Sequence, residues 1–135
     1  MVKILRYVYV ADAGRMINPM LVTGQVHGGV IQGLGGAIYE ENAYDNSGQP
    51  LCTTFIDYLL PSSMESPEIE VSHLETPSPL VPLGAKGAGE GPTESAYAVL
   101  SNAVEDALRP FGTKIRDLPL TPERLWKQIG HSKHA

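Results

Sequence analysis

The chain has 135 residues, which is enough for one domain of ordinary size and leaves little room for a second. Hydrophobic residues make up 42% of the sequence and charged residues 19%, a composition typical of globular proteins rather than disordered or fibrous ones. The net charge of −5, with Lys and Arg spread along the chain, argues against nucleic acid and anionic membrane surfaces as partners. We therefore expect one globular domain over residues 1–135 that binds neither.

The only cysteine is Cys52, so no internal disulfide can form, and no Cys/His spacing is typical of a zinc or iron–sulfur site. A lone thiol in an apolar run indicates a buried residue and a reducing compartment, here the cytoplasm. The apolar run near the N-terminus is interrupted by Arg6 and precedes no plausible cleavage site, which favours a strand over a signal peptide. No side-chain metal ligands are predicted.

One stretch, Leu21–Tyr39, holds no formal charge over nineteen residues and contains two GxxxG spacings, which raises the question of a membrane span. Polar side chains, among them Gln25 and Gln32, interrupt the stretch, and its six glycines dilute its hydrophobicity. The sequence therefore predicts a helix that does not cross a membrane.

The first half of the chain predicts one strand, one helix and a hairpin. Ile4–Ala11 is rich in β-branched and aromatic residues, as strands are. Asn18 precedes a proline, a typical helix start, and the pattern predicts a helix from Pro19 to about Glu41. Asp45–Gly48 is a turn between two short extended runs, of which Thr53–Leu60 is the second.

The second half predicts further elements of both kinds. Glu68–Leu74 alternates apolar and polar residues, as a half-buried strand does. A loop over Thr76–Gly91 follows, with three prolines and four glycines, and a helix begins at Pro92 with apolar residues at helical spacing. Lys114–Leu118 is predicted as a short strand, and Thr121 caps a last helix. This order predicts a single α+β domain with a small mixed sheet and two main helices.

The glycine-rich helix is the first segment that breaks the local rules, because six glycines cost a helix roughly 5 kcal/mol relative to alanine. Five residues share one face of it: Gln25, Gly28, Gly29, Gln32 and Gly36. A smooth face with two amides permits close approach by another element or by a polar ligand. From the pattern alone, tight packing is favoured and ligand contact is the alternative.

The second such segment is the loop Gly84–Gly91, ahead of the second main helix. Its backbone N–H groups and the positive end of the helix can hold an anion, but neither a Walker spacing nor a GxGxxG fingerprint is present. Glu90 stands between Gly89 and Gly91, so no neighbouring side chain covers it and it can project into a cleft. On the residues alone, a solvent-facing glutamate that caps the helix is the favoured alternative.

Four other polar residues receive structural interpretations. Lys86 is most simply a surface lysine, and Asp12 with Arg15 is expected to form a turn pair. His27, on a packed helix, is expected to be a core histidine with its hydrogen bonds satisfied. No Ser/His/Asp or Cys/His arrangement for nucleophilic catalysis is apparent.

Several motifs in fixed order carry a resemblance that these patterns alone do not. The runs DAGRMINP, GQVHGGVIQGLGGAIYEE, FIDYLLP, HLETPSP, GAKGAGEG and LSNAVEDAL together resemble the xanthine dehydrogenase, aldehyde oxidase and carbon monoxide dehydrogenase family. The likeness is to the C-terminal end of the molybdenum-binding large subunit, and it covers the chain from about Asp12 to Ile129.

The resemblance implies roles for particular residues. In that family the glutamate of the GxKGxGE stretch is the active-site base, which corresponds to Glu90. The cofactor is molybdenum bound to molybdopterin, shared with segments upstream of the matched part, and 2Fe–2S and FAD centres are expected on partner domains or subunits. The residues expected to contact or approach the cofactor are Gln25, Gly28, Gly29, Gln32, Gly87 and Gly89.

These implications lead to two main functional hypotheses. In the first, the chain is a catalytic part of a molybdenum hydroxylase for an aldehyde or N-heterocycle, or for carbon monoxide, working with the remaining large subunit and with iron–sulfur and FAD subunits. In the second, it is a non-catalytic interaction module. An anion- or nucleotide-binding protein that uses Gly84–Gly91 is a third, poorer fit. Because the family's large subunit is several times longer, we expect the isolated chain to hold no stable molybdenum centre and to leave the smooth face of its first helix exposed.

Overall fold

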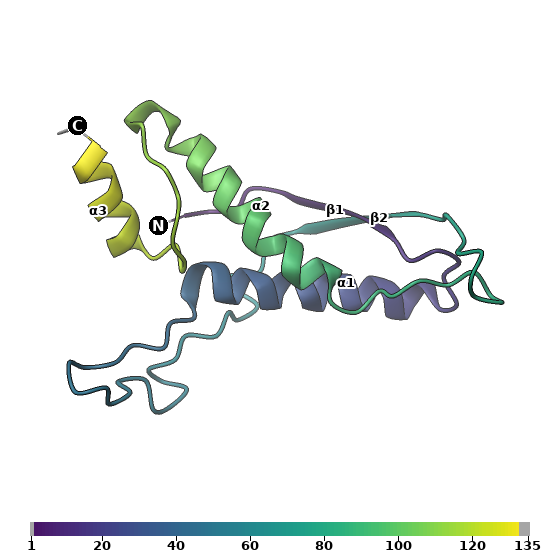
Figure 1. Cartoon of the computed structure of the whole chain (residues 1–135), viewed down its shortest axis with the longest axis horizontal. Coiled ribbons are helices and arrows are strands. Elements are labelled where there is room, and N and C mark those ends of the chain that lie inside the picture. The colour runs from purple at the N-terminus through teal and green to yellow at the C-terminus, as the bar shows by residue number, and fades with distance from the viewer. Residues whose placement is uncertain (1, 133–135) are drawn as a thin grey trace.

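The computed structural model describes residues 2–132, and for residues 131 and 132 it describes the backbone alone. Its elements in chain order are β1 (Tyr7–Asp12), α1 (Pro19–Leu34), a π-helical turn η1 (Gly35–Tyr39), β2 (Ile69–Leu74), α2 (Gly91–Ala107), a 3-10 turn η2 (Arg109–Phe111) and α3 (Pro122–Ser132) (Figure 1). The predicted α+β class is confirmed, with α1 and α2 as the two main helices. None of the helices within residues 2–132 has the length and apolarity that crossing a bilayer requires.

The sheet consists of β1 and β2, which pair in parallel from Tyr7 opposite Ile69 to Asp12 opposite Leu74. The strands expected over Ile4–Ala11 and Glu68–Leu74 are therefore present, and the sheet is a parallel pair rather than a mixed one. Alternate strand residues face a core formed with the helices, to which Tyr7, Val26, Val30, Leu34, Ala37, Ile38 and Leu100 contribute. Because the strands are parallel, both end at the same edge of the sheet, and this edge carries the site described below.

The two main helices approach each other closely along part of the glycine face of α1 (Figure 1). A Cβ atom added at Gly29 would lie 2.9 Å from the Pro92 side chain, and one at Gly33 would lie 2.5 Å from the Thr93 carbonyl oxygen. Tight packing is therefore the correct interpretation at these two glycines. On the smooth face itself, Gly29 is buried, which contradicts the expected exposure, whereas Gln25, Gly28 and Gln32 are exposed as expected. Gly24 and Gly28 differ, because a Cβ at either would meet nothing within 4 Å.

The helix predicted from Pro19 to about Glu41 begins as expected and ends with a wider turn. The Asn18 side chain accepts a hydrogen bond from the Leu21 amide at 3.1 Å, which satisfies one of the free N–H groups of the first turn. After Leu34 the helix widens into η1, and Glu40 leaves in an extended conformation. Gly35 permits this exit, because any side chain there would collide with the Glu40 carboxylate.

Two predicted extended segments do not form strands. Thr53–Leu60 folds into turns, in which the Tyr58 amide donates to the Thr54 carbonyl at 3.0 Å and the Thr54 hydroxyl donates to the Asp57 carboxylate at 2.9 Å. Lys114–Leu118 is irregular, and within it the Ile115 amide donates to the Glu105 side chain at 2.9 Å. Both predictions are wrong because nearby carbonyls and side-chain oxygens, rather than a neighbouring strand, accept hydrogen bonds from these backbone amides.

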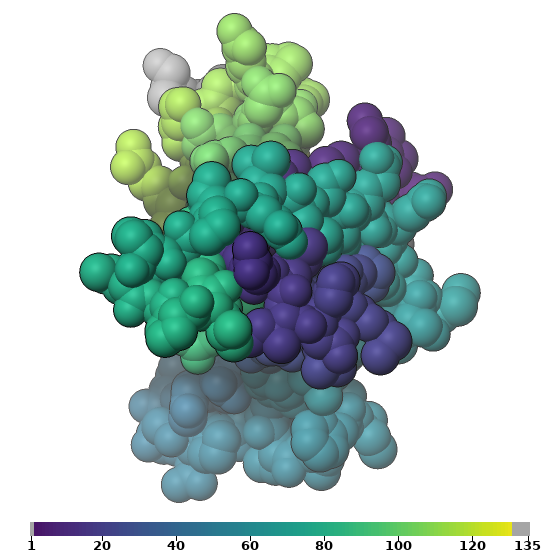
Figure 2. Space-filling view, turned by 90° about the vertical axis from the view of Figure 1, so that its right-hand side faces the viewer, coloured from purple at the N-terminus to yellow at the C-terminus, as the bar shows by residue number. Residues whose placement is uncertain are grey.

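Residues 42–66 leave the body of the domain as a projecting segment, here called the apolar arm (Figure 1). The predicted turn is present, with the Gly48 amide donating to the Asp45 carbonyl at 3.0 Å, and Tyr44 and Pro50 form a short antiparallel bridge. Figure 2 shows the atoms of the arm gathered at the lower end of the molecule. Large apolar side chains stand exposed along it: Tyr44, Leu51, Phe55, Ile56, Leu59, Leu60 and Met64.

Candidate functional site

The site begins with the carboxylate of Asp12, the last residue of β1, at the edge where both strands end. Its oxygens accept hydrogen bonds from the Gly14 amide at 2.9 Å, the Thr76 amide at 3.2 Å and the Lys86 ammonium at 3.1 Å. The Thr76 hydroxyl also donates to this carboxylate, and Lys86 donates to that hydroxyl at 2.6 Å. We call Asp12, Gly14, Thr76 and Lys86 the Asp12 network.

This network corrects two sequence interpretations. The ion-pair partner of Asp12 is Lys86, 74 residues away in sequence, and not Arg15. Lys86 is therefore more than a free surface lysine. The Thr76 hydroxyl, then the amides of Gly14 and Thr76, then Lys86 hold the pKa of Asp12 well below its usual value, because each donates to the ionised carboxylate.

Backbone hydrogen bonds fasten the following loop to the turn after β1. The Lys86 amide donates to the Ala13 carbonyl at 2.8 Å, and the Arg15 amide donates to the Gly84 carbonyl at 3.1 Å. Gly14 lies between these bonds with a φ of +61°, and a Cβ atom there would run into the Gly84 carbonyl oxygen. The close approach of the two segments therefore requires glycine at position 14.

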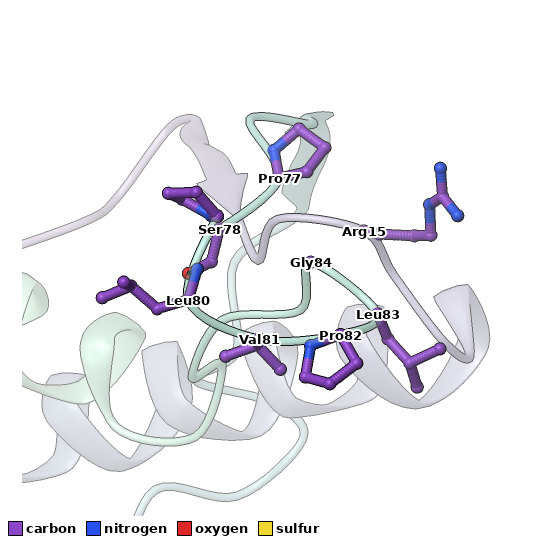
Figure 3. Close-up of a pocket in the computed structure, with 9 residues that line it drawn as sticks. Arg15, Pro77, Ser78, Leu80, Val81, Pro82, Leu83 and Gly84 are labelled. Carbon is purple, nitrogen blue, oxygen red and sulfur yellow. Dashed lines mark hydrogen bonds between the residues drawn. The ribbon is translucent and has the colours of Figure 1, made fainter.

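A shallow surface hollow of about 500 Å³ lies beside this junction, lined by Arg15 and by residues 77–84 (Figure 3). Figure 3 shows the loop curling around Gly84, with the Arg15 side chain extending away from it. Two of the apolar side chains on the loop, Leu80 and Leu83, are exposed to solvent. Arg15 is the only ionisable residue among those that line the hollow, so it offers no acid–base pair for catalysis.

Glu90 directly precedes the first turn of α2. Its backbone carbonyl accepts hydrogen bonds from the amides of Thr93 at 3.0 Å and Glu94 at 3.1 Å, so the residue starts the helix with its main chain. Its side chain makes no capping hydrogen bond and is exposed. The interpretation of Glu90 as a side-chain helix cap is therefore wrong, and among the described residues its carboxylate has no hydrogen-bond partner.

The start of α2 lies against α1 at the level of Gln25. A Cβ atom added at Gly89 would lie 3.9 Å from the Gln25 amide nitrogen, so the residue before Glu90 borders that amide. Gly29, one turn further along α1, is buried beneath Pro92 and so belongs to the contact between the helices. The structure thus brings Gln25, Gly89 and Glu90 together at one end of the helix pair.

The remaining site candidates are exposed, but Gly28 lines a separate hollow with Ile31 and Ile69 rather than the cavity that Gly87 borders. Gln32 and Gly28 are exposed on α1, and Gly87 is exposed in the loop. A Cβ atom added at Gly28 or Gly87 would meet nothing within 4 Å, so the backbone there is open to close approach from outside. His27 is also exposed, which corrects its interpretation as a core histidine, and Cys52 is only partly buried.

Sequence reasoning missed two residues of the site. Thr76 belongs to the Asp12 network, and its position two residues after the end of β2 was the available signal. Tyr9 was not predicted, although its hydroxyl would lie 3.3 Å from a Cβ atom added at Gly91. A small cavity of about 60 Å³ under the loop is lined in part by Tyr9, Gly87 and Gly91. Tyr9 lies in β1 and Thr76 lies just after β2, so the two residues are far apart in sequence although both lie beside this loop.

The chemistry of these groups fits a polar organic cofactor rather than a directly bound metal ion. Within residues 2–132, no group of three or more His, Cys, Asp or Glu side chains is placed to hold a metal ion. Two exposed amides, Gln25 and Gln32, each offer a donor and an acceptor. The backbone at Gly28 and Gly87 is open to close approach, and Glu90, whose carboxylate is unpaired among the described residues, follows Gly89, which borders the Gln25 amide.

Comparisons with known proteins define the class of this arrangement. A sequence model of the molybdopterin cofactor-binding domain matches residues 1–67. The nicotine 6-hydroxylase large subunit of Paenarthrobacter nicotinovorans is 47% identical over 124 residues, which cover 92% of this chain and 15% of that subunit. The carbon monoxide dehydrogenase large chain of Hydrogenophaga pseudoflava is 39% identical over 127 residues, which cover 94% of this chain and 16% of that one.

A solved structure extends the likeness to three dimensions. Quinoline 2-oxidoreductase from Pseudomonas putida 86 superposes with a TM-score of 0.92 at 46% identity, over 95% of this chain and 16% of that chain. The chain belongs to the molybdenum hydroxylase family of xanthine dehydrogenase, aldehyde oxidase and carbon monoxide dehydrogenase, where it matches the C-terminal part of the large subunit. The resemblance drawn from the sequence motifs is confirmed. The chain spans 15% to 17% of the length of the curated relatives that it matches.

Proposed function

We propose that this chain contributes the catalytic base, Glu90, and one wall of the molybdopterin pocket to a molybdenum hydroxylase. The observation that carries the proposal is an exposed carboxylate at the start of α2, without a hydrogen-bond partner among the described residues, that directly follows Gly89, the residue bordering the Gln25 amide. A general base needs an accessible lone pair, and this carboxylate has one. Asp12, by contrast, is committed to its network and cannot serve.

The cofactor would be held by amides and by bare backbone. Gln25 and Gln32 suit a pterin group that both donates and accepts hydrogen bonds, and Gly28, Gly87 and Gly89 let it approach the main chain. When bound, the molybdenum–molybdopterin group supplies the two-electron redox chemistry of the reaction. The 2Fe–2S and FAD centres that would carry the electrons away belong to partner domains or subunits in this proposal.

Within this scheme Glu90 accepts a proton from the group that attacks the substrate. Its glycine neighbours leave the carboxylate uncovered. The start of α2 holds the residue in place, because Pro92 is packed on Gly29. Rigid placement matters, because a base has to lie within about 3 Å of the proton it removes. The backbone on both sides of Glu90 is thus as much a part of the proposed site as the carboxylate itself.

The proposed substrate is a small molecule with an electrophilic carbon, either an aldehyde or an N-heterocycle. Two relatives at 46% to 47% identity are a nicotine 6-hydroxylase and a quinoline 2-oxidoreductase, and both nicotine and quinoline contain an aromatic nitrogen ring. This identity favours the N-heterocycle over the aldehyde and over carbon monoxide, whose enzyme is 39% identical. The ring would meet Glu90 from the side that the rest of the large subunit completes.

The proposed partner of the chain is the remaining part of a large subunit. The apolar arm supports this proposal, because Phe55 is 83% exposed, Ile56 88% and Met64 87%, which is unusual for side chains of this size in a free domain. An apolar groove of about 750 Å³ between the N-terminal segment, α2 and α3 points the same way. The cytoplasm is the proposed location, since the lone thiol of Cys52 suits a reducing compartment.

The test is Glu90→Gln in the large subunit that contains this chain, with Glu94→Gln as its control. Both residues are exposed glutamates at the start of α2, so the two variants change charge and stability alike. We expect Glu90→Gln to lower kcat by roughly 10² to 10⁴, because it removes the base, with molybdenum content and subunit assembly unchanged. Glu94→Gln should retain turnover.

A non-catalytic interaction module is the second candidate function, and the exposed apolar arm is the observation that favours it. That module would assemble with the larger subunit while Glu90 takes no part in turnover. Unchanged kcat in Glu90→Gln, together with intact assembly, would establish the module and exclude the catalytic proposal. Loss of turnover in both glutamate variants would point to a general effect of charge at the start of α2.

A further inference from the structure

The segment that carries Glu90 is held mainly from its two ends. Within residues 2–132, Gly87, Ala88 and Gly89 make no backbone hydrogen bonds, and a Cβ atom at Gly87 would meet nothing within 4 Å. At one end, Pro92 is packed on Gly29 of α1. At the other end, the Lys86 side chain reaches across the strand ends to the Asp12 network. The three residues between these anchors have little of their own to fix them.

We propose that Lys86 and Thr76 are positioning residues for Glu90, and that they act by anchoring the loop to the carboxylate of Asp12. This inference rests on the proposed catalytic function of Glu90. Lys86 lies four residues before Glu90, so its attachment determines where the glycine segment starts, as α2 determines where it ends. The network therefore limits the positions that the free carboxylate can take, although none of its members touches substrate.

An ordinary surface ion pair would not have this effect, since exposed pairs contribute little and are readily replaced by water. This pair also lies at the surface, with 38% of the Lys86 side chain and 30% of the Asp12 side chain accessible, but it is one part of a larger set of hydrogen bonds. The carboxylate accepts from two backbone amides, a hydroxyl and an ammonium, and so satisfies both of its oxygens. A network of this kind orders its members more strongly than one pair does.

Strand pairing and a backbone hydrogen bond hold the members of the Asp12 network in place. Asp12 and Leu74 are paired in the sheet. Thr76 follows Leu74 by two residues, so the pairing of the strands places it next to the Asp12 carboxylate. Lys86 is itself bound through its amide to the Ala13 carbonyl at 2.8 Å. Both ends of the Lys86 residue, main chain and side chain, are therefore attached to the edge where the strands end, and displacement of the loop breaks several bonds at once.

The first test measures loop order directly, by amide hydrogen exchange of the full chain. Lys86→Met keeps the length of the side chain and removes the ammonium. We expect exchange at the hydrogen-bonded amides of Arg15 and Lys86, which fasten the loop to the turn after β1, to rise about tenfold while α1 is unaffected. Lys114→Met is the control, because it breaks another lysine–carboxylate ion pair, to Glu105 at 2.7 Å, away from this loop. Unchanged exchange at the Arg15 and Lys86 amides, or equal acceleration throughout α1, would overturn the proposal.

The second test separates positioning from general stabilisation in the assembled enzyme. Thr76→Val removes the hydroxyl at nearly constant volume, whereas Thr76→Ser retains it. We expect the valine variant to lower kcat about tenfold with KM within about twofold, and the serine variant to restore kcat. A loose loop with unchanged kcat would overturn the positioning role. Failure of the proposed function is seen separately, as unchanged kcat in Glu90→Gln, while the exchange experiment still reports on the anchor.

Discussion

The site at the ends of β1 and β2, here called the strand-end site, differs from the apolar arm in where its side chains find partners. At the strand ends, polar groups find their partners within the chain, as when Asp12 accepts from Thr76 and Lys86 over more than sixty residues of sequence. In the arm, most polar bonds are short in range, such as Ser47 to Asp45, although the Tyr58 hydroxyl donates to Glu40, and the large apolar side chains are exposed. One region is complete in itself and the other is not.

This difference explains how a part of a large subunit can present an organised site. The residues that orient Glu90 need no help from other polypeptide, because the sheet edge and the helix pair supply it. The exposed Phe55 and Ile56, in contrast, gain stabilisation only when another surface covers them. The positioning of Glu90 and the covering of the apolar arm are therefore separate properties. Mutations at the strand ends should change the first, and mutations in the arm should change the second.

Gly14→Ala should produce the largest loss of stability among these changes, and Gly48→Ala is its matched control in the arm. Both glycines have positive φ values, +61° and +84°, which a side chain adopts at a cost of about 1–2 kcal/mol. At Gly14 the new methyl group would also collide with the Gly84 carbonyl oxygen, whereas at Gly48 it meets nothing within 4 Å. We expect a loss of about 2–4 kcal/mol for Gly14→Ala and about 1 kcal/mol for Gly48→Ala, measured by urea unfolding.

Equal losses in the two variants would show that the strand-end junction yields as easily as the exposed turn. The contact between the turn at Gly14 and the loop at Gly84 would then be no more rigid than the turn in the arm. A larger loss at Gly48 would have the same meaning, because that turn contacts nothing beyond itself.

Acid should weaken the strand-end network in a way that depends on Asp12. The pKa of this carboxyl is well below its usual value of 3.8 in the folded chain, because hydroxyl, amide and ammonium groups donate to its ionised form. Its contribution to stability is therefore complete above the unfolded pKa and is lost as the pH falls from about 4 toward the folded pKa. In unfolding experiments across this range, Asp12→Asn should flatten the dependence of the free energy of unfolding on pH.

The arm carries its own carboxyls with lowered pKa values, and these serve as the internal comparison. Ser47 lowers the pKa of Asp45 and Ser62 lowers that of Glu65, in each case by hydrogen bonds to side chain and backbone. Asp45→Asn should therefore alter the same slope less than Asp12→Asn does. An Asp12 variant with the parent's slope would contradict the hydrogen bonds described for the network.

What the sequence could predict was largely local. The spacing of Ala96, Leu100 and Val104 placed them on the buried face of α2, and all three are buried. The strand over Glu68–Leu74 was also predicted, since alternation reports one covered face directly. Thr53–Leu60 failed because β-branched and aromatic residues describe a strand only where another strand is available, and here the Thr54 hydroxyl turns the chain instead.

The site shows the same limit. Glu90 could be singled out because its glycine neighbours are adjacent in sequence, and Gln25 because helical periodicity put it on the smooth face. The partnership of Asp12 with Lys86 could not, since 74 residues separate them and their meeting depends on parallel pairing of β1 with β2. Sequence pattern identified the candidate base, and only the tertiary structure identified what anchors its loop.

The smallest effect on stability is expected in the apolar arm, from Phe55→Ser combined with Ile56→Ser. These side chains are 83% and 88% exposed, so removing them should change the free energy of unfolding by no more than about 0.5 kcal/mol each. The same variant should bind much less of a hydrophobic dye and self-associate less, because the arm holds many of the exposed apolar side chains. Leu80→Ser, at a residue 90% exposed in the loop 77–84, is the control and should leave most dye binding in place. If the arm variant instead lost several kcal/mol, its side chains would have to be packed on the body of the domain, and both regions would then be complete without another polypeptide.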